Sequence, residues 1–387
     1  YRLHLLSAVC AAGAIAVLYI AARLMRLQPV GAAAAGLFLA VSPVFWSQAL
    51  IAEVYTLNAL FVSLVLALAA AWGSGAARRP AVLGALALVF GLSLTHHRTM
   101  LLLTPGLLAY LLVGRGRGEQ ATDDRLPRSA VVWLPLLFAL PLLLYAYIPL
   151  RGAVTSSLDG TYVNTLQGFL SWVLASSYTS FLRDNPLQQS AMTATAYLAL
   201  LNEQFGWGGL LLVLLGVVWM IVRRRRVLLL LALVWLAVVA FVRLYRVADA
   251  PVFLIPSFMV AALAIGAGVH ALAVGAVPQI GATLLRRKRA AATTPPAASR
   301  VAGVRLWLTA AVVVILAALL LADNVPQLDM SDEWAVHNYA VDVLSQPLEP
   351  AAAIVGILGE MTLLRYMQET HAMRPDIQTV AANDDAQ

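Results

Sequence analysis

The polar residues between two apolar stretches near the start of the chain are the first candidates for chemistry. They read Ser47-Gln-Ala-Leu-Ile-Ala-Glu53-Val-Tyr55-Thr-Leu-Asn58 and combine a carboxylate with a phenol, amides and hydroxyls. A carboxylate at membrane depth costs several kcal/mol unless it is hydrated or paired, so its presence indicates a polar cavity. The alternative is that Glu53 lies in water just beyond a helix end. The residues by themselves leave both interpretations open.

A second polar group, His96-His97-Arg98, interrupts another apolar region. Its functional interpretation is a site for a phosphate or for sugar hydroxyls, and its alternative is a hydrated turn with an interfacial cation. Two neighbouring histidines on a helix point about 100° apart. They cannot ligate one metal ion in the usual i, i+4 manner, so we expect no zinc site here.

The composition is that of a polytopic membrane protein. Hydrophobic residues make up 61% of the 387 residues and charged residues only 12%, which no soluble core needs. The net charge of +7 comes from basic residues at the ends of apolar stretches, where they orient helices, so we expect no nucleic-acid partner. Cys10 is the only cysteine, which excludes a disulfide framework and a thiolate metal site.

Apolar stretches long enough to approach or cross a bilayer recur along the chain, which predicts an all-α membrane protein of about ten helices. They lie near residues 4–22, 30–45, 55–72, 81–97, 99–113, 130–149, 206–222, 227–243, 252–274 and 305–322. The stretches 81–97 and 99–113 are short and almost contiguous, so they can also form one hairpin that stops short of a full crossing.

Basic residues fill every second connection between these stretches, which predicts that those connections face the cytoplasm. They are Arg23 and Arg26, Arg78 and Arg79, Arg115 to Arg128, Arg223 to Arg226, and Arg286 to Arg305. The complementary face then receives residues 46–54, the turn at 96–99, residues 150–205, the turn at 243–251, and the tail from Asp323. We expect a multi-pass protein of a bacterial plasma membrane whose active face and C-terminal tail lie outside.

Three more arginines and an aspartate lie on this predicted outer face. Arg151 closes an apolar stretch, so it is either an anchor whose charged end reaches the headgroups or a fork aimed at a lipid phosphate. Arg243, Arg246 and Asp249 form a dense polar cluster. Two outer arginines run against the usual charge bias, which favours anion binding over a role in helix orientation.

The outer segments also carry structural signals. Residues 164–182 read as an amphipathic helix on the membrane surface, with Phe169, Trp172, Val173 and Phe181 to bury. From Asp332 the chain becomes charged, and an apolar run at 353–358 predicts the opening strand and helix of an incomplete soluble α/β segment. We therefore divide the chain into a transmembrane domain, residues 1–322, and an outer segment, residues 323–387.

Several of these motifs together resemble one known family. They are Tyr1-Arg-Leu-His-Leu-Leu-Ser-Ala, Phe45-Trp-Ser-Gln-Ala-Leu-Ile-Ala-Glu-Val-Tyr-Thr-Leu-Asn-Ala-Leu-Phe61, Gly91-Leu-Ser-Leu-Thr-His-His, Tyr147-Ile-Pro-Leu-Arg-Gly and Thr165-Leu-Gln-Gly-Phe169. The chain is similar to the family catalogued as domain of unknown function 2723, which includes transmembrane protein 260-like O-mannosyltransferases and is assigned to the GT-C superfamily of membrane glycosyltransferases. The resemblance covers nearly the whole chain.

The resemblance implies a GT-C-like helix bundle that transfers a sugar, with mannose as a candidate, from a polyprenyl-phosphate donor to a protein or glycan acceptor at the outer face of the membrane. Arginines would stabilise the departing phosphate while a carboxylate takes the proton of the acceptor hydroxyl. We assign Glu53 to the acceptor side as supporting acid or base. Substrate contacts are assigned to Tyr55, His96, His97, Arg98, Arg151, Arg243, Arg246 and Asp249. The chain has no Asp-x-Asp triplet. We therefore assign no cofactor and leave metal dependence open.

Two departures from the family pattern affect these expectations. Family members carry an earlier helix and an acidic outer loop before the position matching Tyr1, and position 1 here is not Met. We therefore expect an N-terminally truncated chain whose principal acid lies upstream. Where relatives have Trp-Gly-Asp before the Thr-Leu-Gln-Gly-Phe run, this chain has Asp159-Gly-Thr-Tyr162, which leaves the role of that tryptophan unassigned.

Two other function classes remain open at this stage. A transporter or lipid flippase would use Glu53 and the arginines to line a path through the bilayer, and it would place charges near mid-membrane in pseudo-symmetric halves. The sequence instead clusters them on one predicted face. A non-catalytic family member would bind the carrier lipid without consuming it.

The alternation of basic loops predicts the side on which each connection is accessible. Single cysteines at Arg117 and Arg225 should react with a membrane-impermeant maleimide only from the cytoplasmic side, and cysteines at Asp159 and Asp342 only from the outside. Labelling of both pairs from the same side would contradict the predicted topology.

Overall fold

All ten apolar stretches contain helix in the computed structural model, which describes residues 2–75, 79–113, 128–155, 162–185, 188–276 and 298–382. The chain divides into a larger unit, Tyr1–Tyr145 with Ser177–Leu328, and a smaller unit, Ala146–Ser176 with Asp329–Gln387. Along the chain the helices before the tail are α1 (Arg2–Leu24), α2 (Pro29–Ala40), α3 (Pro43–Leu50), α4 (Tyr55–Ser74), α5 (Arg79–His96), η1 (Arg98–Leu103), α6 (Thr104–Leu112), α7 (Ala130–Ala139), η2 (Leu140–Ala146), α8 (Tyr147–Gly152), α9 (Leu166–Val173), η3 (Ser176–Tyr178), α10 (Ser180–Arg183), α11 (Ala194–Arg223), α12 (Arg225–Leu244), α13 (Ala250–Phe253), α14 (Ile255–Ala273) and α16 (Ala298–Leu328).

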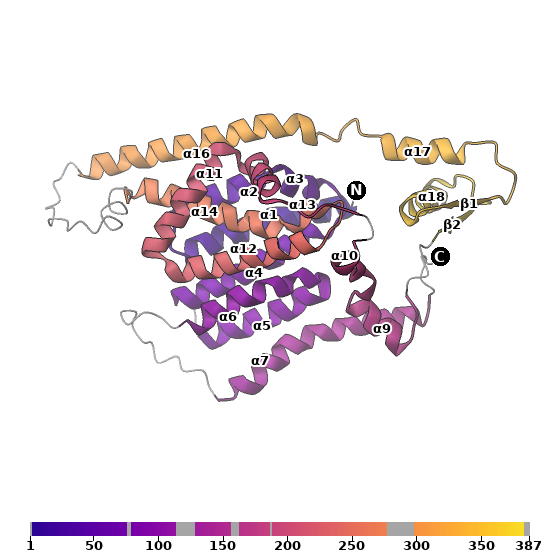
Figure 1. Cartoon of the computed structure of the whole chain (residues 1–387), viewed down its shortest axis with the longest axis horizontal. Coiled ribbons are helices and arrows are strands. Elements are labelled where there is room, and N and C mark those ends of the chain that lie inside the picture. Colours follow the sequence, from indigo (N-terminus) through magenta and orange to yellow (C-terminus); the bar gives the residue numbers. More distant parts are fainter. Residues whose placement is uncertain are drawn as a thin grey trace. The chain divides into compact units, whose positions relative to one another are not determined.

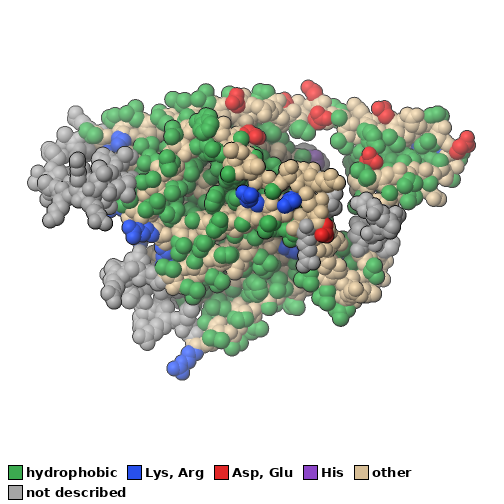
Figure 2. Space-filling view, in the orientation of Figure 1, with side chains coloured by type: hydrophobic (Ala, Val, Ile, Leu, Met, Phe, Trp, Pro, Cys, Tyr) green, Lys and Arg blue, Asp and Glu red, His purple; other side chains and the backbone are tan. Residues whose placement is uncertain are grey.

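The helices have the lengths that a bilayer requires. Among the described residues, seven are long and apolar enough to cross a membrane, and α2 with α3, bent by 64°, makes an eighth. The expected stretches 81–97 and 99–113 form two shorter apolar helices, Pro80–His96 and Arg98–Leu112. Apolar side chains cover most of the visible face of the bundle (Figure 2). The protein is an integral, multi-pass membrane protein.

Helix α14 forms the centre of the larger unit, where nearly all of its residues are buried. It packs against α2, α11 and α12 (Figure 1). Glycines allow this close approach, because a Cβ on Gly216 of α11 would lie 1.9 Å from the Ala264 carbonyl oxygen and one on Gly31 of α2 would lie 2.5 Å from that of Gly266. Small residues are the usual means of bringing membrane helices into van der Waals contact.

The bend between α2 and α3 exposes backbone groups that distant side chains satisfy. Pro43 begins α3 and has no N–H to continue the α2 hydrogen-bond ladder. The Val41 carbonyl accepts a hydrogen bond from Asn324 Nδ2 at 2.7 Å, and the Val44 N–H donates to Gln204 Oε1 at 3.0 Å. Both amide side chains are buried, so α11 and α16 stabilise a break that would be costly alone.

The outer segment 164–182 differs from the single amphipathic helix expected from its sequence. It forms three short pieces, α9, η3 and α10, because Ala175 adopts a left-handed backbone conformation with φ of 53°. A left-handed residue ends an α-helix. Phe169, Val173 and Phe181 are only half-buried and Trp172 is exposed, so this segment does not bury its apolar side chains within the chain.

The tail forms the strand and helix that the sequence predicts, and it continues into a second strand. Helix α17 (Ala335–Leu344) precedes β1 (Ala353–Gly356), α18 (Leu358–His371) and β2 (Gln378–Ala381). The two strands pair in parallel, with Ala353 opposite Gln378, and α17 packs on α18 around Leu344, Leu364 and Met367. Helix α16 runs to Leu328, so it continues past the domain boundary that we predicted at residue 322.

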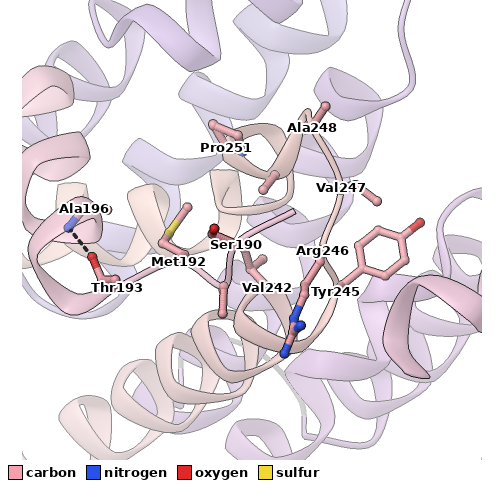
Figure 3. A pocket seen from close by; sticks show the side chains of 12 residues that line it. Ser190, Met192, Thr193, Ala196, Val242, Tyr245, Arg246, Val247, Ala248 and Pro251 are labelled. Atoms are coloured by element: carbon pink, nitrogen blue, oxygen red, sulfur yellow. Dashed lines mark hydrogen bonds between the residues drawn. The ribbon is translucent and has the colours of Figure 1, made fainter. Parts of the chain in front are cut away.

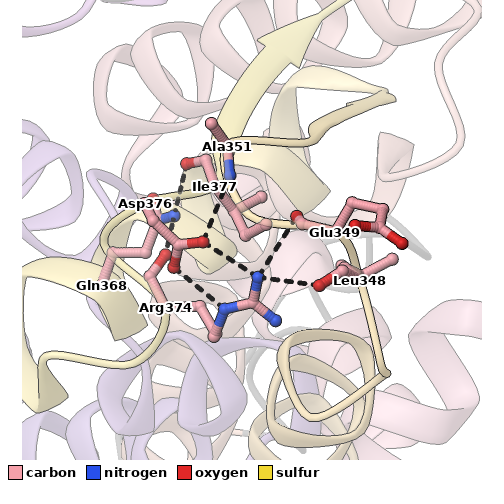
Figure 4. Close-up of polar contacts among 7 residues, drawn as sticks. All are labelled: Leu348, Glu349, Ala351, Gln368, Arg374, Asp376 and Ile377. Atoms are coloured by element: carbon pink, nitrogen blue, oxygen red, sulfur yellow. Dashed lines mark hydrogen bonds and ion pairs between the residues drawn. The ribbon is translucent and has the colours of Figure 1, made fainter.

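A half-buried arginine joins the two loops that lead into the strands (Figure 4). Arg374 donates through Nε and Nη2 to the two carboxylate oxygens of Asp376, both at 2.9 Å, and Nη2 also donates to the Leu348 carbonyl at 3.1 Å. The Ala351 N–H donates to Asp376 Oδ2 at 3.3 Å. These hydrogen bonds, those from Arg374 first, lower the pKa of Asp376 to about 2.

The lowered pKa of Asp376 predicts how the stability of the tail depends on pH. Because this carboxyl holds its proton less tightly in the fold than in the unfolded chain, its contribution is present above about pH 4 and is lost as the pH falls towards 2. Hydrogen-exchange protection factors of the β1 amides should therefore fall over this range, and Asp376→Asn should flatten the dependence. The exposed Asp332→Asn serves as control, and an unchanged dependence in Asp376→Asn would contradict this role.

Candidate active site

Three turns that are distant in the chain meet in the larger unit. The first joins α3 to α4 and holds Glu53, the second is the break between α5 and η1 at His97, and the third joins α12 to α13 and holds Asp249. The Tyr55 hydroxyl donates to Asp249 Oδ2 at 3.4 Å, and His96 Nε2 lies 2.9 Å from the Val54 carbonyl oxygen. Each of the two later turns therefore contacts the first.

The break at His97 separates the roles of the two histidines. His97 has an extended backbone conformation, with φ of −145° and ψ of 122°, so its ring does not follow the helical direction of His96. A carbonyl oxygen only accepts hydrogen bonds, so His96 must carry its proton on Nε2, which leaves Nδ1 as an acceptor in the neutral ring. His97 Nδ1 instead lies 2.6 Å from Thr99 Oγ1.

Aromatic rings surround these polar groups. The Tyr55 ring lies 5.8 Å from the His97 ring and 5.5 Å from the Phe253 ring, and the His97 and Phe253 rings are 6.2 Å apart. Tyr245 packs edge-on against Phe253 at 5.2 Å. Such pairs hold ring orientations more firmly than apolar burial alone. The phenol and imidazole groups therefore lie in a fixed aromatic setting.

His97 is neutral at physiological pH. Its partial burial, together with the nearby His96 and the Arg98 charge, lowers its pKa to about 4. A neutral imidazole can accept or donate a hydrogen bond without adding charge to the site. In the described part of the chain, no group of three or more histidine, cysteine, aspartate or glutamate side chains could hold a metal ion, so the expectation of no zinc site at the two histidines still stands as a prediction.

Glu53 lies at the open side of this cluster. Its side chain is exposed in the turn between α3 and α4, where Oε2 accepts a hydrogen bond from the Val54 N–H at 3.4 Å. Its charge and that of Asp249 both act on the Tyr55 hydroxyl. Glu53 thus occupies a hydrated helix end, which is the alternative that the sequence left open. It also borders the polar cluster.

The arginines expected to bind substrate do not form a single group. Arg98, Arg243 and Arg246 belong to the larger unit and are exposed. Arg246 lines a pocket of about 360 Å³ together with Tyr245 from the same turn and with Met192 and Thr193 from the segment leading into α11, which lie on the other side of the pocket (Figure 3). Arg243 does not line this pocket, and Arg151 belongs to the smaller unit.

Tyr245 connects the pocket to the polar cluster, and the sequence did not single it out. Its ring lines the pocket and also contacts Phe253, four residues after Asp249. Its spacing from Asp249 and Phe253 was no signal either, because Tyr245 and Asp249 lie in the turn between α12 and α13 rather than on one helix. The carbonyl of Val54 carried no signal, since every residue has one.

Comparisons with known proteins agree with this architecture. Residues 1–120 match a family model described as the N-terminal domain of protein O-mannosyl-transferase TMEM260. Protein O-mannosyl-transferase TMEM260 of Mus musculus is 30% identical over 188 residues, which cover 47% of this chain and 26% of the relative. The chain thus spans about a quarter of the length of the curated relative that it matches. The resemblance expected from the sequence is confirmed for this part of the chain, and its extension over nearly the whole chain stays a prediction.

A solved structure shares the fold. The crystal structure of ArnT from Cupriavidus metallidurans bound to undecaprenyl phosphate superposes with a TM-score of 0.58 at 18% identity, covering 94% of this chain and 70% of that one. The expected fold class, an all-α polytopic helix bundle, is therefore confirmed, and the chain shares this fold with that structure. The family match ends at residue 120, so it includes Glu53, Tyr55 and the two histidines but not Arg246 or Asp249.

The lowered pKa of His97 predicts a pH dependence of stability. Since the fold favours the neutral ring, the contribution of His97 is complete above about pH 6.5 and is lost as the pH falls towards 4. The thermal midpoint in detergent should fall more steeply between pH 7 and 5 in the wild type than in His97→Gln. His4→Gln, at an exposed histidine of α1, should keep the wild-type slope, and equal slopes in all three would contradict the assignment.

Proposed function

We propose that this protein transfers a sugar from a polyprenyl-phosphate donor to an acceptor hydroxyl, such as that of a protein side chain, at the outer face of the membrane. The observation that carries the proposal is the meeting of Glu53, Tyr55, His97 and Asp249 from three distant turns of a GT-C-like bundle. The names of the two relatives, an O-mannosyl-transferase and a protein bound to undecaprenyl phosphate, support this choice of donor and reaction.

The reaction needs a group that accepts a proton. The acceptor oxygen attacks the anomeric carbon, the bond from that carbon to the phosphate oxygen breaks, and the electron pair leaves with the phosphate. The hydroxyl proton passes to a carboxylate. We assign this side of the site to Glu53, because its carboxylate is exposed and an incoming acceptor can reach it.

Asp249 and the neighbouring rings have a positioning role in this proposal. Asp249 accepts the hydrogen bond of the Tyr55 hydroxyl, so it fixes the phenol rather than meeting the acceptor itself. His96 and His97 are assigned to hydrogen bonds with sugar hydroxyls or phosphate oxygens. The acceptor capacity left on His96 Nδ1 suits a hydroxyl donor.

The leaving phosphate needs positive charge as it departs. Arg246 is the strongest candidate in the larger unit, because it lines a pocket that Tyr245 links to the polar cluster. A guanidinium donates two parallel hydrogen bonds to a phosphate, which gives it an advantage over a lysine. Arg98 and Arg243, both exposed, are assigned to the same anion.

The orientation of the site follows from the basic loops of the sequence and belongs to this proposal. With those loops in the cytoplasm, the turns that hold Glu53, His97 and Asp249 face outside. A lipid-borne donor then meets the acceptor at the membrane boundary. The fold shared with ArnT favours this enzyme over the transporter. A second argument is the position of the charges, because a transporter would need them along a path through the bilayer.

Conversion of Glu53 to glutamine tests the proton-transfer role. Glu53→Gln keeps the side-chain shape and removes the charge, so it should lower the rate of sugar transfer by about 10²-fold while donor binding changes little. Consumption of a radiolabelled polyprenyl-phosphate sugar measures the rate. Glu369→Gln, at an exposed carboxylate of α18, is the matched control. A wild-type rate in Glu53→Gln would contradict the proton-transfer role and support the alternative interpretation of Glu53 as a hydrated carboxylate at a helix end.

A second arm of this experiment addresses the donor. Arg246→Lys keeps the charge but loses the bidentate fork, so it should weaken donor binding as well as turnover, whereas Arg128→Lys should change neither. Binding of the polyprenyl-phosphate sugar without any consumption would indicate a non-catalytic carrier-binding protein instead.

A further inference from the structure

The smaller unit holds a separate pocket around Arg151. It has a volume of about 250 Å³, and its lining includes Tyr147, Arg151, Gly152, Thr155, Tyr162 and Trp172. Among the described residues, no carboxylate or imidazole belongs to the lining. The described lining therefore offers a cation and aromatic surface but no side chain that readily accepts a proton near neutral pH, which suits a ligand that is bound rather than converted.

Hydrogen bonds and close packing fix the walls of this pocket. The Tyr162 hydroxyl donates to Asn164 Oδ1 at 2.9 Å, and Asn164 Nδ2 donates to the Pro149 carbonyl at 3.2 Å. The Tyr162 ring meets Trp172 edge-on at 5.8 Å. A Cβ on Gly152 would lie 2.5 Å from Tyr162 Cε1, so only glycine lets the ring close onto α8.

The pocket lies at the end of a membrane span. Helix α8, which carries Arg151, is the last part of the apolar span Ala130–Gly152. Leu150, within the span, is 70% exposed, and the surface stays apolar beyond the span, where Val154 is 80% and Leu166 74% exposed. Exposed apolar surface that continues a transmembrane helix is most simply covered by lipid.

The charge of this segment further limits the class of ligand that the pocket can bind. In the described residues of this segment, 146–155 and 162–176, Arg151 is the only side chain with a formal charge. Tyrosine and tryptophan beside an arginine are typical of the layer where lipid headgroups lie. An anionic headgroup complements this pocket, and a guanidinium matches the geometry of a phosphate.

We propose that the described parts of this segment, residues 146–155 and 162–176, rest in the headgroup layer of the bilayer and that their pocket binds the phosphate of an anionic glycerophospholipid through Arg151. The rings of Tyr147 and Trp172 contact the glycerol and upper acyl region, while the exposed leucines and valines enter the leaflet. This site holds a structural lipid and does not depend on the proposed sugar transfer.

Lipid retention tests the pocket. Purified protein is exchanged into detergent with phosphatidylglycerol, phosphatidylcholine or undecaprenyl phosphate, and native mass spectrometry measures the bound lipid. The wild type should retain phosphatidylglycerol in preference to phosphatidylcholine, and Arg151→Ala should weaken this binding by about tenfold, as expected for a charge-assisted hydrogen bond. Gly152→Ala, which keeps the charge and displaces Tyr162, should weaken it too, whereas Ala153→Ser should not.

Two results would overturn the proposal. The first is equal retention of phosphatidylglycerol by the wild type and Arg151→Ala. The second is retention of undecaprenyl phosphate without retention of phosphatidylglycerol, which would show that the pocket binds the sugar carrier.

Accessibility gives an independent measurement of the location of this segment. In a Cys10→Ser background, single cysteines replace Leu166 or Val355, which are both exposed apolar side chains, at 74% and 64%. In lipid nanodiscs a charged maleimide should label Leu166→Cys at least about tenfold more slowly, because only that position lies in the leaflet. Equal labelling rates would show that the segment lies in water and would overturn the proposal.

Discussion

Hydrocarbon offers no partner to an unpaired backbone amide or carbonyl, and this constraint decides where the chain places its chemistry. Within a span each backbone group bonds to its own helix, so polar side chains gather where helices end or break. Glu53, His97 and Asp249 all occupy such positions. The break between α2 and α3 persists because Gln204 and Asn324 supply the partners that the bilayer cannot.

The packing around α14 makes these separate helix ends into one site. Its glycines allow α2 and α11 each to pack closely against α14. Helix α12 packs against α14 on one side and against α6 and η1 on another. The turn after α12 is thereby held beside the break after α5. Tyr55 and Asp249, 194 residues apart in the chain, can then share a hydrogen bond.

The two units differ in what their polar groups can do. The cluster in the larger unit combines carboxylates, imidazoles and a phenol with a nearby arginine pocket, which is what a group transfer with a departing anion requires. The pocket of the smaller unit combines one guanidinium with aromatic rings. That set suits an anion at an apolar boundary, and the described lining contains no carboxylate or imidazole that could activate a nucleophile.

Local sequence patterns predicted much of the architecture. The apolar stretches predicted helices because the length and composition of a membrane span are properties of one contiguous segment. The strand and helix of the tail were predicted for a similar reason. The break of residues 164–182 at Ala175 was not, because a left-handed alanine follows from the surrounding packing and leaves no mark in the residue type.

The sequence by itself determined that this is a polytopic membrane protein, and it singled out residue types suited to sugar and phosphate chemistry at the helix ends. Only the tertiary structure decided which of them meet. It joined Glu53, Tyr55, His97 and Asp249 and added Tyr245 and Phe253, while Arg151 fell in another unit. The physical reason is that hydropathy is set along the chain, whereas hydrogen bonds and ring contacts depend on which distant helices pack together.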